Sequence, residues 1–230
     1  MTLMLSSCID QATPDATPAP HAAPAKPARS GATPIPQDSF QRDSQSIVGI
    51  SYPAGLERHP GLAHVLVNYA HAQRAALANA LALNPDPPLP YELTLRFTTA
   101  ADSPRLYAVR ADGELYTGAA SRPRKAAFIW LSASNRLLKP DELIVDPAGW
   151  VVVQRFIHES KVTAGATVGG TLPPLVPLLD SAGRISAVDV LLNEGGVLVP
   201  ASLLRPYAAP EYAGWFVSDT AEAGAAVGTH

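Results

Sequence analysis

The feature that most constrains the fold is a proline-rich segment near the N-terminus. Between Gln11 and Pro36 seven of the 26 residues are proline, and alanine fills much of the rest. Proline cannot donate a backbone hydrogen bond, so a segment of this composition cannot build a packed core. The sequence therefore predicts an extended, semi-rigid tether over residues 9–43, a folded domain over residues 44–218 and a disordered tail over residues 219–230.

The only cysteine of the chain, Cys8, lies just before the tether. Leu5-Ser6-Ser7-Cys8 resembles the lipobox of bacterial lipoproteins, in which the thiol carries a diacylglycerol. Seven residues precede Cys8 and none is Lys or Arg, so residues 1–8 are interpreted as the remnant of a signal that starts upstream. The alternative is a free thiol in a disordered terminus. The lipobox interpretation predicts a protein of the bacterial cell envelope, lipid-anchored to a membrane and facing the periplasm.

Composition excludes several classes of function. A net charge of −3 and a pI near 6.0 argue against a nucleic-acid partner, because phosphate binding requires an excess of basic residues. One cysteine cannot form a cysteine-rich zinc site or an internal disulfide. No other pattern points to a cofactor or a metal, so we expect neither.

Hydrophobic periodicity indicates two helices among several strands. Apolar residues recur at helical spacing from Leu62 to Ala80, and Asp146-Pro147 is typical of the start of a second helix that runs to about Ser160. Strands are expected at 47–53, 91–97, 107–115, 128–131, 185–192 and 197–200. This order predicts an α+β fold, with an antiparallel sheet and two main helices packed on one face.

The stretch from Tyr107 to Leu115 allows two interpretations. Asp112-Gly113 is typical of a hairpin turn, but that turn would mix polar and apolar side chains on both faces. As a single strand, Arg110, Asp112 and Glu114 share one side and the apolar residues share the other. We therefore expect one long strand, in which Gly113 marks a bulge or a close approach of another backbone.

Several segments together resemble a known family. It is the bacterial ectodomain family of unknown function shared by the lysozyme-sensing anti-sigma factor RsiV, the accessory region of the peptidoglycan deacetylase PdaC and many envelope lipoproteins. The resemblance covers nearly all of the folded part and lies in Ile50–Pro53, His59–Leu62, Leu115–Gly118, Phe128–Leu131, Leu137–Leu143, Val199-Pro200 and Leu203–Tyr207. Two features differ: Ala119-Ala120-Ser121 replaces the loop that carries a histidine in the family, and Asn193–Gly196 is shorter than the equivalent segment.

The resemblance implies a non-enzymatic, lipid-anchored envelope protein. Its periplasmic domain would bind a lysozyme-like protein or a cell-wall ligand such as peptidoglycan. No nucleophile elbow or zinc-protease motif occurs in the sequence. The alternative function is an envelope-acting hydrolase that uses surface carboxylates, and it predicts converging acidic side chains with a raised carboxylate pKa.

Two groups of residues are candidates for ligand binding. The first is the basic loop with Arg122, Arg124 and Lys125, which could equally be a solvated loop. The second is the aromatic group Tyr207, Tyr212 and Trp215, which could stack on sugars or simply dock onto the sheet.

Overall fold

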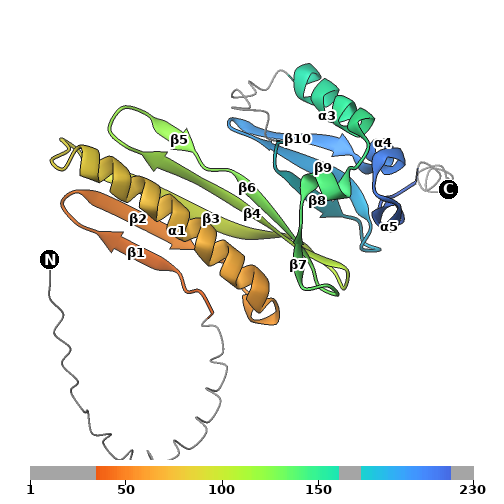
Figure 1. Cartoon of the computed structure of the whole chain (residues 1–230), viewed down its shortest axis with the longest axis horizontal. Coiled ribbons are helices and arrows are strands. Elements are labelled where there is room, and N and C mark those ends of the chain that lie inside the picture. Colours follow the sequence, from red (N-terminus) through yellow and green to blue (C-terminus); the bar gives the residue numbers. More distant parts are fainter. Residues whose placement is uncertain (1–34, 161–171, 219–230) are drawn as a thin grey trace, which may run out of the picture. The chain divides into compact units, whose positions relative to one another are not determined.

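A computed structural model describes residues 35–160 and 172–218 (Figure 1). Cys8, most of the predicted tether and the predicted tail lie outside the described residues. The helices and strands are β1 (Ser39–Arg42), β2 (Ser46–Ser51), η1 (Leu56–Arg58), α1 (Pro60–Leu83), β3 (Tyr91–Asp102), β4 (Leu106–Tyr116), β5 (Ser121–Pro123), β6 (Ala126–Leu131), β7 (Arg136–Leu138), α2 (Pro140–Leu143), α3 (Pro147–Glu159), β8 (Leu175–Leu179), β9 (Ile185–Leu192), β10 (Gly195–Pro200), α4 (Ala201–Leu204), η2 (Arg205–Tyr207) and α5 (Pro210–Ala213).

The strands form two sheets. A large seven-stranded sheet has the order β1-β2-β3-β4-β6-β7, with β5 paired to β4, and a small three-stranded sheet has the order β10-β9-β8. Every pair is antiparallel except β2–β3, which is parallel because α1 connects these two strands. The predicted α+β class with a mainly antiparallel sheet is therefore confirmed.

Helix α1 covers one face of the large sheet (Figure 1). Its fully buried residues Leu62 and Leu66 pack against Leu93 of β3 and Val109 of β4. The burial of β3 alternates strictly over its first seven residues, as expected for a strand with one covered face. The face of the large sheet opposite α1 is covered only in part.

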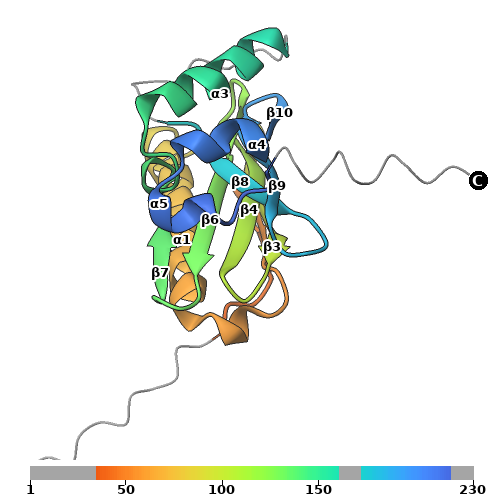
Figure 2. The ribbon, with the colours of Figure 1, turned by 90° about the vertical axis from the view of Figure 1, so that its right-hand side faces the viewer.

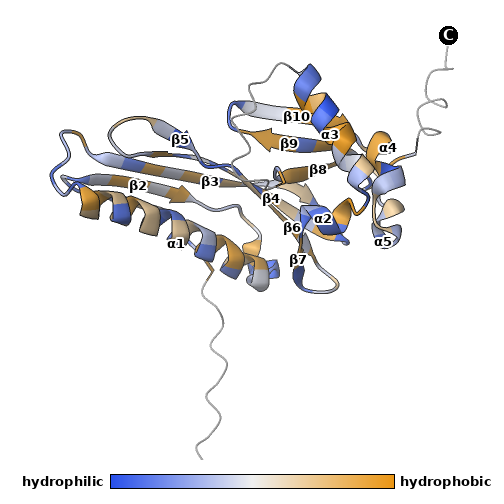
Figure 3. Cartoon of the chain, turned by 45° about the horizontal axis from the view of Figure 1, so that its top comes forward, coloured by the Kyte–Doolittle hydropathy of each residue, from blue (hydrophilic) through white to orange (hydrophobic). Residues whose placement is uncertain are grey.

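The small sheet covers one end of that opposite face. Leu106 and Ala108 of β4 belong to the same core as Val188 and Val190 of β9, and β8 contacts β3, β4 and β6. Both β8 and β9 are hydrophobic along most of their length (Figure 3). A strand buried on both sides requires this composition.

The prediction that both main helices pack on one face of a single sheet is not confirmed. Helix α1 shares a core with the large sheet, whereas Val153 and Ile157 of α3 belong to the core of the small sheet. Helices α3 and α4 contact the strands of the small sheet (Figure 2). The physical reason is that one end of β4 and β6 is apolar on both faces, so it requires a second covering layer.

Strand β4 confirms the prediction of one long strand. Gly113 pairs with Leu95, and a Cβ at Gly113 would collide with the backbone carbonyl oxygen of Thr94. Gly113 therefore marks a close approach of two backbones. By contrast, the segment 121–125 is not entirely loop, because Ser121–Pro123 forms β5 and pairs with β4.

The folded part begins earlier than predicted. Strand β1 lies within the range expected to be tether, and it pairs with β2 over four residues. A strand this short at the edge of a sheet satisfies the outer hydrogen bonds of β2 without needing a buried hydrophobic side. This is why composition alone assigned it to the tether.

Candidate functional site

Two parallel rows of side chains cross the face of the large sheet opposite α1. In one row Phe40, Gly49 and Thr94 are successive cross-strand partners on β1, β2 and β3. In the next row Ser51 and Arg96 are partners, and Arg96 is the partner of Asp112 on β4. Cross-strand partners point to the same side of a sheet, so all these side chains share the face that α1 leaves free.

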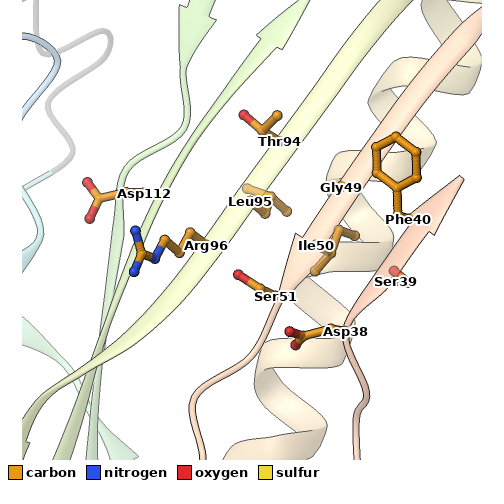
Figure 4. A pocket seen from close by; sticks show the side chains of 10 residues that line it. All are labelled: Asp38, Ser39, Phe40, Gly49, Ile50, Ser51, Thr94, Leu95, Arg96 and Asp112. Carbon is orange, nitrogen blue, oxygen red and sulfur yellow. The ribbon is translucent and has the colours of Figure 1, made fainter. Parts of the chain in front are cut away.

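These two rows surround a shallow hollow of about 490 Å³ (Figure 4). The residues that line it are Asp38, Ser39, Phe40, Gly49, Ile50, Ser51, Thr94, Leu95, Arg96 and Asp112. Its lining combines an aromatic ring, hydroxyl groups, a guanidinium and carboxylates. We define this surface as the sheet hollow, and it is the candidate functional site.

Phe40 forms one wall of the sheet hollow. The residue is 71% exposed, and it is the one aromatic among the exposed large hydrophobic residues of the described chain. Gly49 lies beside it in the same row, and a Cβ at Gly49 would be 3.8 Å from the Phe40 ring. The ring thus shields the glycine with one side and offers its remaining surface to solvent.

An ion-pair network borders the sheet hollow. Arg110 Nη1 donates a hydrogen bond to Asp189 of β9 at 2.8 Å, and its Nε and Nη2 donate to Asp112. Lys125 Nζ lies 2.6 Å from Asp112. Arg110 therefore links the large sheet to the small sheet, and Asp112 is neutralised by two cations.

The two aspartates of this network differ in pKa. Burial raises the pKa of Asp189 above its ordinary value, and the charge of Arg110 offsets this only in part. Burial also acts to raise the pKa of Asp112, but the hydrogen bonds from Arg110 and Lys125 hold that pKa below its usual range. The contrast follows from the number of cations that each carboxylate contacts.

Arg96 is the exposed cation of the sheet hollow. Within the described part of the chain its guanidinium has neither an ion pair nor a hydrogen bond, although Figure 4 shows it extending toward Asp112. Asp112 is already bonded to Arg110 and Lys125. The carboxylate of Asp38 accepts the backbone N–H of Tyr52 at 2.7 Å, so it holds the edge of the sheet.

The structure does not bring the predicted basic loop together as one patch. Lys125 binds Asp112, which lines the sheet hollow. Arg122 is exposed on β5 and pairs with Leu115, whose side chain lies on the α1 side of the sheet. Arg124 lies near Tyr69 of α1: burial raises the pKa of that tyrosine, and the charge of Arg124 opposes the increase. The buried Nε of Arg124 has no hydrogen-bond partner among the described residues. Only Lys125 of the three borders the site.

The predicted aromatic group is docked onto the core of the small sheet. Tyr212 is 7% exposed, its ring centroid lies 4.7 Å from that of Trp215, and its hydroxyl accepts a hydrogen bond from Arg136 at 3.0 Å. Tyr207 and Trp215 are partly buried against the same core. Of the two alternatives for this group, the structure supports docking rather than an open stacking surface.

The described residues contain neither a cluster of metal ligands nor a membrane-spanning helix. In residues 35–160 and 172–218, no three His, Cys, Asp or Glu side chains converge as metal ligands would. No helix in these ranges combines the length and the apolar character required to cross a bilayer. Cys8, the predicted lipid site, lies outside these ranges.

The sequence reasoning missed Phe40, Gly49, Thr94 and Arg96 as a group. The strict alternation of 91–97 already places Thr94 and Arg96 on the polar side of their strand. What was missing is the register of β2 on β3, which decides that Gly49 and Phe40 continue the row. A parallel pair has no connecting turn from which the register can be predicted.

Comparison of the sequence with models of known protein families finds no match, and a search of curated proteins finds none either. The structure, however, is similar to solved structures. A DUF3298 family protein from Pseudomonas aeruginosa PAO1 superposes with a TM-score of 0.52 at 13% identity, and the alignment covers 79% of this chain and 97% of that chain. A member of the same family from Bacteroides fragilis NCTC 9343 gives a TM-score of 0.47 at 11% identity, with 77% and 94% covered. The first likeness shows a shared fold.

Proposed function

We propose that this protein is a non-enzymatic binding protein of the bacterial cell envelope, and that the sheet hollow holds a cell-wall ligand. The observation that supports the proposal most is the character of the hollow: it is open, and it combines the exposed Phe40 ring with hydroxyl groups, a guanidinium and carboxylates. Saccharides are bound by surfaces that combine an aromatic ring with polar groups able to bond to hydroxyls. A lysozyme-like protein partner is the other ligand that the family resemblance implies.

The arrangement of carboxylates supports binding rather than hydrolysis. Asp112 is neutralised by Arg110 and Lys125. Asp189 does not line the sheet hollow. A glycosidase would require two carboxylates that flank a bond, one of them free to donate a proton. Neither of these aspartates is free in this way, and Asp38, the other carboxylate that lines the hollow, accepts the backbone N–H of Tyr52.

The hydrolase alternative draws on one observation, the raised pKa of Asp189 beside a second carboxylate. A direct test compares the release of soluble fragments from purified peptidoglycan by the wild-type chain and by Asp189→Asn. We expect no release from either protein. Release by the wild type that disappears in Asp189→Asn would support the hydrolase instead.

The proposed location depends on a lipid at Cys8, and on the likeness to the envelope ectodomains of RsiV and PdaC. Intact mass of the protein extracted from the bacterial envelope tests this part separately. The expected mass includes a diacylglycerol on Cys8 and lacks residues 1–7. An unmodified thiol with these residues retained would contradict the anchor but not the binding function.

The binding function is tested by co-sedimentation of the 230-residue chain with purified peptidoglycan sacculi, with immobilised lysozyme as a second surface. We expect retention on the sacculi. Retention on lysozyme alone would assign the protein-binding role, and retention on neither would remove the proposed function.

A further inference from the structure

The separation of the binding groups in the sheet hollow sets the size of the ligand. Phe40 lies on β1 and Arg96 on β3, two strands away and one row further along. Neighbouring strands are about 4.8 Å apart and one row is about 6.7 Å along a strand, so the backbones that carry the two side chains are separated by roughly 12 Å. The Arg96 side chain extends toward Asp112, away from Phe40, so its guanidinium comes no closer to the ring (Figure 4). One sugar ring cannot contact both, whereas a disaccharide can.

The floor between these groups is low. Gly49 contributes no side chain, and Thr94 beside it is a small exposed residue. Ser51 and Thr94 place two hydroxyls between the aromatic wall and the cation. A flat ring can therefore lie on the sheet beside Phe40 while the hydroxyls accept and donate hydrogen bonds along it.

The charge of the sheet hollow selects among disaccharides. Asp112 is neutralised by Arg110 and Lys125, and Asp38 is bonded to the backbone of Tyr52. Arg96 is thus the cation of the hollow that no described side chain neutralises. An arginine fork matches the geometry of a carboxylate and can bind it through two hydrogen bonds.

We infer that the sheet hollow binds a carboxylate-bearing amino-sugar disaccharide, with one ring against Phe40 and the carboxylate on Arg96. This inference deepens the proposed function and rests on it, because it names the part of a cell-wall ligand that the hollow recognises. The competing explanation is structural: Phe40 only shields Gly49, and Arg96 is one of many solvated arginines. The two explanations differ in what substitution of each residue does to ligand selectivity.

The experiment is isothermal titration of the 230-residue chain with two matched probes. One is the N-acetylglucosaminyl–N-acetylmuramic acid disaccharide, which carries a carboxylate, and the other is di-N-acetylchitobiose, which is neutral and otherwise similar. We expect the acidic disaccharide to bind about fivefold or more tightly than the neutral one at low salt, and the preference to shrink as salt increases.

The variants separate the two roles. Arg96→Gln should abolish the preference for the acidic disaccharide and leave binding of the neutral one unchanged. Phe40→Ala should weaken both disaccharides about fivefold or more, and Phe40→Tyr should restore them. Arg105→Gln and Leu83→Ala serve as matched controls, because both residues are exposed and lie outside the hollow. Circular dichroism confirms that each variant is folded.

Three outcomes would overturn the inference. The first is equal affinity for the two disaccharides, and the second is a preference that survives Arg96→Gln. The third is binding of a D-alanyl-D-alanine dipeptide that depends on Arg96 but not on Phe40, which would assign a peptide ligand. If sacculi retain the chain but either disaccharide result fails, the inference fails while the proposed function stands. If sacculi and lysozyme both fail to retain the chain, the proposed function itself fails.

Discussion

The link between the two sheets gives a quantitative prediction for Arg110. This residue reaches from β4 to Asp189 of β9, and the side chains of the pair are 29% and 12% exposed. Asp189 is the only charged residue in the buried class of the described chain. Its carboxylate lies over Gly196, where a Cβ would collide with it, so a residue with a side chain does not fit at position 196 beside this group.

Arg110→Met removes the cation and leaves a nearly buried carboxylate without a partner. Breaking a fully buried pair costs about 3–5 kcal/mol, whereas an exposed pair contributes about 0–1 kcal/mol. Since Arg110 is partly exposed, we expect Arg110→Met to lower the free energy of unfolding by about 2–3 kcal/mol. Asp189→Asn keeps the shape and leaves Arg110 bonded to Asp112, so its cost should be about 1 kcal/mol.

The double variant isolates the interaction. In the Asp189→Asn background no buried charge is left unpaired, so Arg110→Met should cost about 1–2 kcal/mol less than in the wild type. Urea unfolding followed by circular dichroism and tryptophan fluorescence supplies the four free energies. A coupling energy below about 0.5 kcal/mol would refute the claim that this pair joins the sheets.

The pH dependence provides a second check on the same variants. Burial raises the folded-state pKa of Asp189, and removal of Arg110 removes the main effect that lowers it. In Arg110→Met the folded state therefore binds more protons than the unfolded state between the ordinary aspartate pKa and the raised one. Its stability should increase as pH falls through this window. The penalty of Arg110→Met should accordingly shrink as pH is lowered from 7 toward the ordinary aspartate pKa, and a penalty that stays constant over this range would contradict the assignment.

Three further substitutions test the fold, and a fourth, Gly214→Ala, serves as a control. Gly113→Ala should lower the free energy of unfolding by about 3 kcal/mol, because the new Cβ would meet the carbonyl of Thr94. Nothing lies within 4 Å of a Cβ added at Gly214, so Gly214→Ala should change this free energy by less than about 0.5 kcal/mol. Thermal melts of the two variants compare them. Asp146→Ala removes the side chain that accepts the Ala148 N–H at the start of α3 at 2.8 Å, and urea unfolding should show a loss of about 1 kcal/mol. Tyr107→Phe removes the hydroxyl of a buried ring that bonds to Thr99 and to the carbonyl of Ala54, both of which are exposed residues. Water can replace part of these bonds, so the same assay should show a loss of about 0.5–1 kcal/mol; no loss would mean that water replaces the hydroxyl fully.

Much of the secondary structure could be predicted from local patterns. Helix α1 was predicted from the spacing of Leu62 and its successors, and β9 was predicted with its observed bounds. The partition of residues 107–115 gave both the long strand and the role of Gly113. These features depend on residues near each other in the chain, where periodicity carries the information.

The arrangement of these elements in space was harder to predict from the sequence. The division into two sheets depends on Leu106 and Ala108 finding Val188 and Val190, which lie some eighty residues away. The sheet hollow depends likewise on the register of three strands, one of which was assigned to the tether. Lys125 was identified as a candidate residue, but only the structure shows that it binds Asp112 and that Arg122 and Arg124 lie elsewhere.

The central claim is that the sheet hollow binds a cell-wall ligand without changing it. Backbone amide NMR of the 230-residue chain during addition of soluble glycan strands from peptidoglycan tests both parts in one titration. The account predicts saturable shifts at Phe40, Gly49, Thr94 and Arg96, with the mass of the strands unchanged at the end. Shifts confined to Arg122 and Arg124 or to the aromatic group at Tyr212, or cleavage of the strands, would contradict it.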